Sequence, residues 1–336
     1  AMSTYESLIN ELNALSDHHN EALIMDSVKD LIQIGKLRED DTDLKLVNAS
    51  IKELLKSFEV FHSHKEKPKL CIFGSARTKP DHPNYKMAVD ITKKMTHLGY
   101  DVITGAGPGI METGNKGAEN DSDFGLNILL PFEQTANEYI RNSERLINFK
   151  YFFTRKLIFI KESQASIIFP GGFGTHDELF EVLTLIQTGR CAPRPIILIA
   201  NPASDYWNRW HKYVKEQLCD REYISEDNLS LYEIVSDVNI AIEWIQHYYS
   251  VYHSIRYTKE FAMMRINKSV KQTTLDELSD QFSDIITSGK IEQYSLSELD
   301  DDYDVYPEKP RLVFKFDQEN YGKINEMIIT LNQLEA

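Results

Sequence analysis

Residues 165–178 read ASIIFPGGFGTHDE, and this stretch decides the fold. An apolar segment, Ala165–Phe169, has the composition of a buried strand, Pro170 ends it, and three glycines lie within the next four residues. A helix is predicted to begin at Thr175. Glycine permits close approach of the backbone, and the free N–H groups of a helix start favour an anion. The stretch therefore predicts a strand–loop–helix unit that binds phosphate, with a tight turn lacking any ligand as the alternative.

The same alternation of strand and helix extends through the middle of the chain. Short apolar runs predict strands at 70–73, 101–103, 126–130, 165–169 and 195–199. Amphipathic stretches predict helices at about 84–98, 109–119, 151–163, 175–188 and 205–219. This pattern is typical of an α/β protein with a Rossmann-like, doubly wound parallel sheet covered on both faces. Ligands of such sheets bind beyond the carboxyl ends of the strands, where the glycine-rich turns of this chain fall.

The flanking regions read differently from the middle. Residues 1–66 predict an N-terminal helical extension, interrupted at Gly35, and residues 67–250 a nucleotide-binding domain. Residues 251–336 predict a small α+β appendage with a helix near 274–287, an acidic linker at 298–304 and a strand at 311–316. Neither extension carries a motif with recognisable chemistry.

Composition limits the class of protein. The formal net charge of −15 disfavours nucleic acid as a partner, because a polyanion would be repelled. No apolar run reaches the length that spans a bilayer, and the first residues do not form a secretory signal. Three widely separated cysteines, of which Cys71 and Cys191 are predicted to be buried thiols, fit a cytoplasmic protein. The ten histidines form no metal motif, so we expect neither a metal nor an organic cofactor.

Two further glycine-rich turns follow predicted strands. The first strand leads into Gly74, Ser75 and Arg77. The second leads into a longer loop that contains Gly105, Gly107, Pro108, Gly109 and Met111. Ile110 stands where GxGxxG needs its third glycine, and no acidic residue closes the next strand, so a nicotinamide cofactor is disfavoured. Three such turns on one edge favour a phosphate-bearing ligand.

Glu178 has two interpretations. Thr175 and Glu178 fit the S/T-x-x-E capping box, in which the glutamate serves only the helix start. A carboxylate one turn from a phosphate loop can also activate water or stabilise positive charge on a ribose. Asp177 and Glu181 are neighbours, and the proximity of like charges is expected to raise the pKa of one of these carboxyls.

Arg155 and Lys156 open the helix predicted at 151–163. An arginine binds phosphate through a planar, permanently charged fork. The alternative is a surface cation that pairs with Glu162 or with solvent.

These residues together resemble the LOG family, the "lonely guy" cytokinin-activating phosphoribohydrolases, long labelled possible lysine decarboxylases. The chain matches its PGGxGTxxE signature from Pro170 to Glu178. It also matches the family at Phe73-Gly-Ser, at Gly105-Ala-Gly-Pro-Gly-Ile-Met111 and at Arg155-Lys156. The resemblance covers roughly residues 68–248, and the LIQTG segment at 185–189 is similar to the larger bacterial members.

The resemblance implies a function and roles for residues. It implies hydrolysis of the N-glycosidic bond of a nucleoside 5′-monophosphate such as AMP or a cytokinin riboside monophosphate, with Arg155 and Glu178 as the catalytic pair. It implies that the 5′-phosphate is held by the loop Pro170, Gly171, Gly172, Phe173, Gly174 and Thr175. It also implies a homodimer or a higher homo-oligomer. His176 and Asp177 depart from the more usual Leu-Glu of the family.

Two other functions remain open at this stage. Relatives of this fold carry nucleotide-like ligands such as molybdenum cofactor without hydrolysing them, and the same loops would serve that role. A regulatory protein whose extensions sense a nucleotide such as an alarmone is a third possibility. The preferred base and the role of the extensions are not readable from the sequence.

Overall fold

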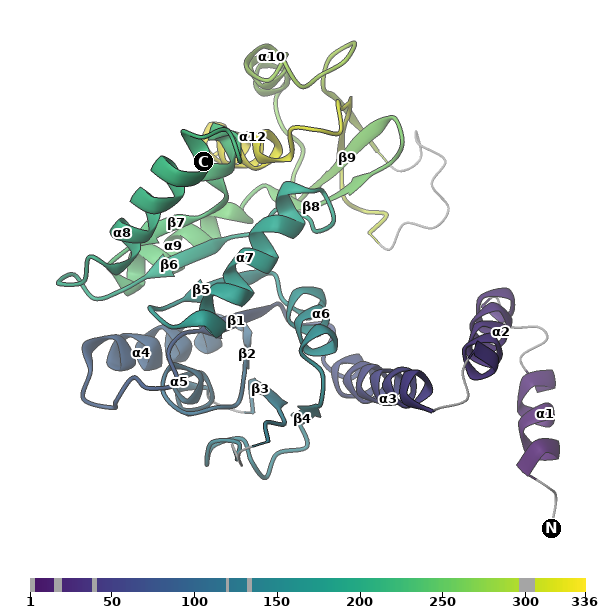
Figure 1. Ribbon diagram of the computed structural model, residues 1–336. Coiled ribbons are helices and arrows are strands. Elements are labelled where there is room, and N and C mark those ends of the chain that lie inside the picture. Colours follow the sequence, from purple (N-terminus) through teal and green to yellow (C-terminus); the bar gives the residue numbers. More distant parts are fainter. Residues whose placement is uncertain (1–3, 15–19, 38–40, 119–120, 132–134, 296–305) are drawn as a thin grey trace. The chain divides into compact units, whose positions relative to one another are not determined.

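The computed structural model describes residues 4–14, 20–37, 41–118, 121–131, 135–295 and 306–336 (Figure 1). The chain divides into two compact units, residues 1–56 and 57–336. The first contains α1 (Thr4–Ala14), α2 (Glu21–Leu37) and most of α3 (Thr42–His62). The predicted break at Gly35 is wrong, because α2 continues to Leu37. One glycine costs a helix only about 1 kcal/mol relative to alanine, so the other residues of α2 outweigh it.

The second unit is built on a seven-stranded parallel sheet of order β4-β3-β2-β1-β5-β6-β7. Its strands are β1 (Lys69–Phe73), β2 (Asp101–Thr104), β3 (Asp123–Ile128), β4 (Leu146–Phe149), β5 (Ala165–Ile168), β6 (Ile196–Ile199) and β7 (Glu233–Val235). The strand order runs one way from β1 to β4 and the other way from β5 to β7. The topological switch point therefore lies between β1 and β5, where open α/β sheets bind their ligands.

Helices cover both faces of this sheet. On one face α4 (Pro83–His97), α5 (Ile110–Gly117) and α9 (Val238–Tyr248) share an apolar core with the strands. On the other face lie α6 (Phe152–Glu162) and α8 (Tyr206–Tyr213), since the Cys71 thiol donates to the Phe159 carbonyl and the Trp207 indole to the Ile199 carbonyl. α7 (Phe173–Gln187) follows β5, and a π-helical segment, η1 (Val214–Cys219), continues α8. The predicted doubly wound α/β class is confirmed.

Local signals explain several helix ends. His82 caps α4 by accepting a hydrogen bond from the Asn84 N–H, and Pro83 occupies the first turn. Asp237 caps α9 by accepting from the N–H groups of Asn239 and Ile240. A 3-10 helix, η2 (Glu226–Leu231), precedes β7.

The sequence missed or misplaced some strands. β3 begins three residues before the predicted 126–130 run, and β4 lies between that run and the helix predicted at 151–163, where no strand was expected. β4 and β7 are the two edge strands and are short, so neither has the continuous apolar run of a central strand.

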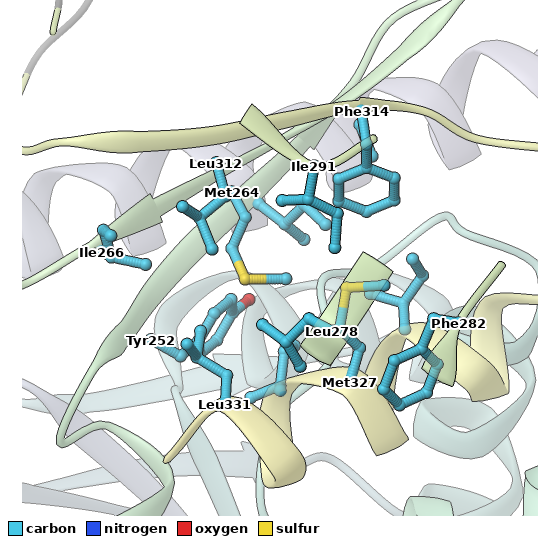
Figure 2. Packing of buried hydrophobic residues seen from close by; sticks show 14 of the residues in the cluster. Tyr252, Met264, Ile266, Leu278, Phe282, Ile291, Leu312, Phe314, Met327 and Leu331 are labelled. Carbon is cyan, nitrogen blue, oxygen red and sulfur yellow. The ribbon is translucent and has the colours of Figure 1, made fainter. Parts of the chain in front are cut away.

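The C-terminal part forms a second, antiparallel sheet of order β10-β11-β9-β8. Its strands are β8 (Tyr252–Tyr257), β9 (Phe261–Ile266), β10 (Glu292–Tyr294) and β11 (Arg311–Lys315), and its helices are α10 (Gln272–Gln281) and α12 (Tyr321–Leu334). Figure 2 shows Met264 and Leu312 of the sheet packed against Leu278 of α10 and Leu331 of α12. The α+β appendage has its expected class. The domain boundaries after 66 and 250 stay predictions, and the acidic segment 298–304 lies outside the described residues.

Helix α12 fixes the far end of α7. Gly189, just after α7, has φ +68, and a Cβ placed there would lie 2.3 Å from the Tyr321 ring. Gln187 donates to Asn228 of η2 at 2.6 Å, and Asn325 of α12 donates to the Ser230 carbonyl at 2.7 Å. The C-terminal helix is therefore joined directly to the helix that follows the PGGFGT loop.

Replacing Gly189 with alanine should destabilise the protein more than the same change at Gly289. Both glycines have positive φ, a conformation that destabilises any residue with a β-carbon by about 1–2 kcal/mol. Of the two, only Gly189 has a neighbouring atom within 4 Å of the added β-carbon. We expect a lower midpoint of urea unfolding for Gly189→Ala than for Gly289→Ala. Equal midpoints would show that Tyr321 moves aside freely.

Candidate functional site

A cavity of about 840 Å³ opens at the carboxyl ends of the central strands. Three loops that follow β1, β2 and β5 form one side, and α6 and α7 form another. Its lining consists of Phe73, Gly74, Ser75, Ala76, Arg77, Gly105, Met111, Ile128, Leu130, Phe152, Arg155, Phe159, Gly171, Gly172, Phe173, Gly174, Thr175, His176 and Glu178. The cavity therefore lies at the switch point of the sheet, as expected for a ligand site of this fold.

Backbone hydrogen bonds connect the three loops. The Ser75 N–H donates to the Pro170 carbonyl at 3.1 Å, and the Ser75 carbonyl accepts from the Ile110 N–H at 3.1 Å. Gly171 permits the close approach, since a Cβ there would lie 2.0 Å from Thr175 Oγ1 and 3.0 Å from the Ser75 nitrogen. Gly172 and Gly174 have no atom within 4 Å of a hypothetical Cβ, so the loop is packed tightly on one side and open on the side of the cavity.

Helix α7 begins earlier than the sequence predicted. Its N-cap is Gly172 and its first residue is Phe173, with the N–H groups of Thr175 and His176 donating to the Gly172 carbonyl. Thr175 is therefore inside the helix, and the predicted capping box of Thr175 and Glu178 is wrong. Glycine is an acceptable N-cap, which the threonine signal obscured. The N–H groups at positions 173 and 174 have no acceptor one turn earlier in the helix and face an open loop.

Glu178 is buried between two cations of α6. Its Oε1 lies 3.8 Å from Arg155 Nη2 and its Oε2 lies 3.9 Å from Lys156 Nζ. The Glu178 side chain is only 5% exposed and the Arg155 side chain 12%. Lys156 also pairs with Asp177 at 2.8 Å and with Glu181 at 3.7 Å. This cluster joins the start of α6 to the start of α7.

Burial dominates the electrostatics of Glu178. Desolvation raises the pKa of its carboxyl to about 7, Lys156 and Arg155 oppose that rise, and Asp177 and Glu181 add to it. Burial also lowers the pKa of Arg155, although a guanidinium stays charged. A carboxyl with its pKa raised toward neutrality suits a group that gives or takes a proton.

Two aromatic rings hold the Arg155 guanidinium. It lies over Phe152 at 5.1 Å and over Phe159 at 5.6 Å, measured to the ring centroids. Its Nε is buried and has no hydrogen-bond partner among the residues that the structure describes. The rings fix the guanidinium at the cavity wall, beside Glu178.

The cavity collects most, but not all, of the predicted site residues. Gly74, Ser75, Arg77, Gly105, Met111, Arg155, the loop 171–175 and Glu178 line it. Gly107, Pro108, Gly109, Lys156 and Pro170 are outside the lining. Of these, Gly109 is the N-cap of α5, and Pro170 and Lys156 hold the neighbouring loop and helix. The alternative partner proposed for Arg155, Glu162, instead pairs with Lys161.

Several lining residues were not predicted. Phe152 and Phe159 stand three residues before and four after Arg155, a spacing that places all three on one helix face and was readable from the sequence. Ile128 and Leu130 gave no such signal, because their place depends on how β3 pairs.

A buried polar network supports the loop after β2. Asn137 donates to the carbonyls of Ala106 and Gly107 and to the side chain of Asn115, which also accepts from Thr104. Ala106 has φ +60, a conformation that is uncommon outside glycine and is maintained here by these bonds. Asn137 lies in an irregular segment, where sequence pattern gives no signal of contact.

Over the described ranges, no three His, Cys, Asp or Glu side chains come together as a potential metal site. Among the helices in those ranges, none combines the length and apolar character needed to span a bilayer. All three cysteines are free, with Cys71 and Cys191 buried as predicted.

Comparisons with known proteins agree with the motifs. Residues 108–245 match the family model described as "Possible lysine decarboxylase". A probable cytokinin riboside 5′-monophosphate phosphoribohydrolase LOG6 of Arabidopsis thaliana is 25% identical over 124 residues, which is 36% of this chain and 60% of the relative. The chain thus aligns with less than two thirds of that relative's length.

Solved structures with similar folds are more distant. The molybdenum cofactor binding protein of Rippkaea orientalis is 19% identical with a TM-score of 0.40, and the Moco carrier protein of Chlamydomonas reinhardtii is 19% identical with a TM-score of 0.38. Each alignment covers 54% of this chain and 96% of the other. DNA processing protein A of Helicobacter pylori is 13% identical with a TM-score of 0.38, over 54% and 81% of the two chains.

Replacing Asp177 with asparagine should lower the pKa of Glu178. The change removes a like charge and releases Lys156 toward Glu178, and both effects favour the carboxylate. Carboxyl NMR of glutamate-labelled protein, assigned with Glu178→Gln, should show the midpoint move from about pH 7 to lower pH. Asp276→Asn, which removes another half-exposed, lysine-paired carboxylate, should leave it in place. A rise for Asp177→Asn would contradict this account.

Proposed function

Because the chain belongs to the LOG family through residues 108–245, we propose that it is a phosphoribohydrolase of nucleoside 5′-monophosphates. It would hydrolyse the N-glycosidic bond to give the free base and ribose 5-phosphate. The observation that carries the proposal is a buried carboxyl with a pKa of about 7, lying in a cavity beside an arginine and a glycine-rich helix start.

The phosphate would bind at the start of α7. The free N–H groups at the helix start, the open Gly172 and Gly174, and Ser75 and Arg77 of the β1 loop form an anion site on one side of the cavity. Glu178 lies within the first turns of the same helix. A phosphate fixed there places C1′ of the attached ribose near that carboxylate, and such orientation contributes several kcal/mol to catalysis, on the order of 7–11 at most.

Hydrolysis then depends on the position of the ribose and on stabilisation of the positive charge that develops at C1′. As the base leaves with the electron pair of the C1′–N bond, C1′ becomes oxocarbenium-like and water adds to it. The Glu178 carboxylate stabilises this charge and accepts a proton from the attacking water. The departing base takes up that proton, so that the products are the neutral base and ribose 5-phosphate. Arg155, at 3.8 Å from Glu178, holds a phosphate oxygen or polarises the base.

A carrier protein for a nucleotide-like cofactor is the second candidate. The glycine loops would serve it equally, but it gives no role to a buried, proton-exchanging carboxyl beside Arg155. The nucleotide panel AMP, GMP, CMP, UMP and a cytokinin riboside monophosphate separates the two, with chromatography of the released base. Release of base from at least one supports the hydrolase, and tight retention of ligand with no release from any supports the carrier.

Glu178→Gln should reduce turnover by at least about 100-fold, the lower range for loss of a general acid–base group. The matched control is Glu181→Gln, whose side chain lies one turn later on α7 and 3.7 Å from Lys156, the lysine that also flanks Glu178. The turnover of this variant should stay within a few-fold of the wild type. Circular dichroism would confirm that both variants fold. Equal rates for Glu178→Gln and the wild type would remove the glutamate from the mechanism.

We also propose that the protein is a homodimer in a cytoplasmic setting and needs no cofactor. Exposed apolar side chains beside the cavity support the dimer, namely Phe153 and Leu157 of α6 and Phe173 of α7.

Light scattering after size exclusion tests the dimer. Leu157→Glu should shift the protein toward the monomer, because it places a charge in the proposed interface. Ile240→Glu, an equally exposed side chain on α9, should not. A monomeric wild type would refute the dimer.

A further inference from the structure

The hydroxyl of Tyr206 contacts the phosphate loop from outside the cavity. Tyr206, the first residue of α8, donates to the Gly171 carbonyl at 2.5 Å and lies 3.4 Å from the Gly171 nitrogen and 2.8 Å from His176 Nε2. Gly171 and His176 line the cavity, while Tyr206 does not. The tyrosine is thus in contact with the loop but not with the space a ligand would occupy.

Counting hydrogens assigns each of these bonds. A phenol has one hydrogen, which goes to the Gly171 carbonyl, and two acceptor positions. The Gly171 N–H and a hydrogen on His176 Nε2 fill those two positions. The His176 ring is therefore the Nε2–H tautomer, and the hydroxyl has no hydrogen-bonding capacity left for water or substrate.

The geometry of a trans peptide transfers this restraint to the cavity. The Gly171 carbonyl and the Gly172 N–H belong to one planar unit and point in opposite directions. Because the carbonyl points to Tyr206, the Gly172 N–H points away from it. Gly172 is exposed and lines the cavity.

We propose that Tyr206, held by His176, is a positioning residue that orients the Gly172 amide toward a bound phosphate. This inference rests on the phosphate site of the proposed function. A diglycine peptide rotates easily because neither residue has a Cβ. Without the phenol, the Gly171 carbonyl would lose the hydrogen bond that holds it away from the ligand, and a carbonyl turned toward the ligand would repel an anion.

The surroundings favour a fixed phenol. The Tyr206 ring packs edge-on against Trp207 at 4.8 Å, and the His176 ring contacts Phe180 at 6.2 Å and Trp210 at 6.4 Å. Burial lowers the pKa of His176, so its ring is neutral at neutral pH. Removing only the hydroxyl leaves this aromatic packing in place.

The test is calorimetric binding of ribose 5-phosphate to Tyr206→Phe. We expect about tenfold weaker binding than the wild type, the scale of one lost hydrogen bond to a positioned group. Tyr213→Phe, an exposed phenol on the same helix, should bind within twofold of the wild type. His176→Leu should weaken binding like Tyr206→Phe, and His176→Gln, which keeps an N–H donor, should restore part of it.

Equal affinity of Tyr206→Phe and the wild type would overturn the inference. No binding of ribose 5-phosphate to the wild type would overturn it together with the phosphate site. Hydrolysis provides an independent measurement. With AMP as substrate, the KM of Tyr206→Phe should rise about tenfold while its kcat stays within about threefold of the wild type. Loss of the fold would instead reduce kcat. Absent hydrolysis of every nucleotide in the panel would refute the proposed function, and the binding comparison would still decide the role of Tyr206.

Discussion

The free energy needed to bury the Glu178 carboxyl constrains the rest of the second unit. A carboxylate removed from water requires nearby positive charge or a proton, and here it has both, since Arg155 and Lys156 flank it and its pKa is about 7. The two cations come from α6 and the acid from α7, so the pair positions two helices that are separated in sequence by β5. The sheet order then places both helix starts at the switch point.

Motif and periodicity predicted the central sheet and the glycine turns at its edge because both depend on local sequence. Apolar runs determine β1, β2, β5 and β6, and glycine turns follow three of the central strands. Edge strands such as β4 depend on pairing with a neighbour, which composition does not report. The start of α7 was misplaced because Thr175 has the chemistry of a helix cap. In the structure the Thr175 side chain instead lies against Gly171, and Gly172 is the N-cap. The aromatic contacts of Arg155 were available from the spacing of Phe152 and Phe159.

The glycines of the site suit both candidate functions, and only the Glu178 side chain favours one function over the other. Loops that approach a phosphate closely serve a carrier and a hydrolase alike. A carboxyl whose pKa is raised by burial suits a proton-transfer step, which a hydrolase has and a carrier lacks. The polar network of Asn137 and Asn115 adds rigidity to the opposite wall, which either function requires.

The packing of α12 against the end of α7 also affects how the protein is made. During translation α7 emerges from the ribosome long before α12. The Gly189 turn therefore lacks its contact with Tyr321 while the intervening residues are synthesised. Contacts between residues so far apart in sequence form late in folding. A nascent chain can therefore build the central sheet early, yet α7 gains its last support only after α12 has emerged.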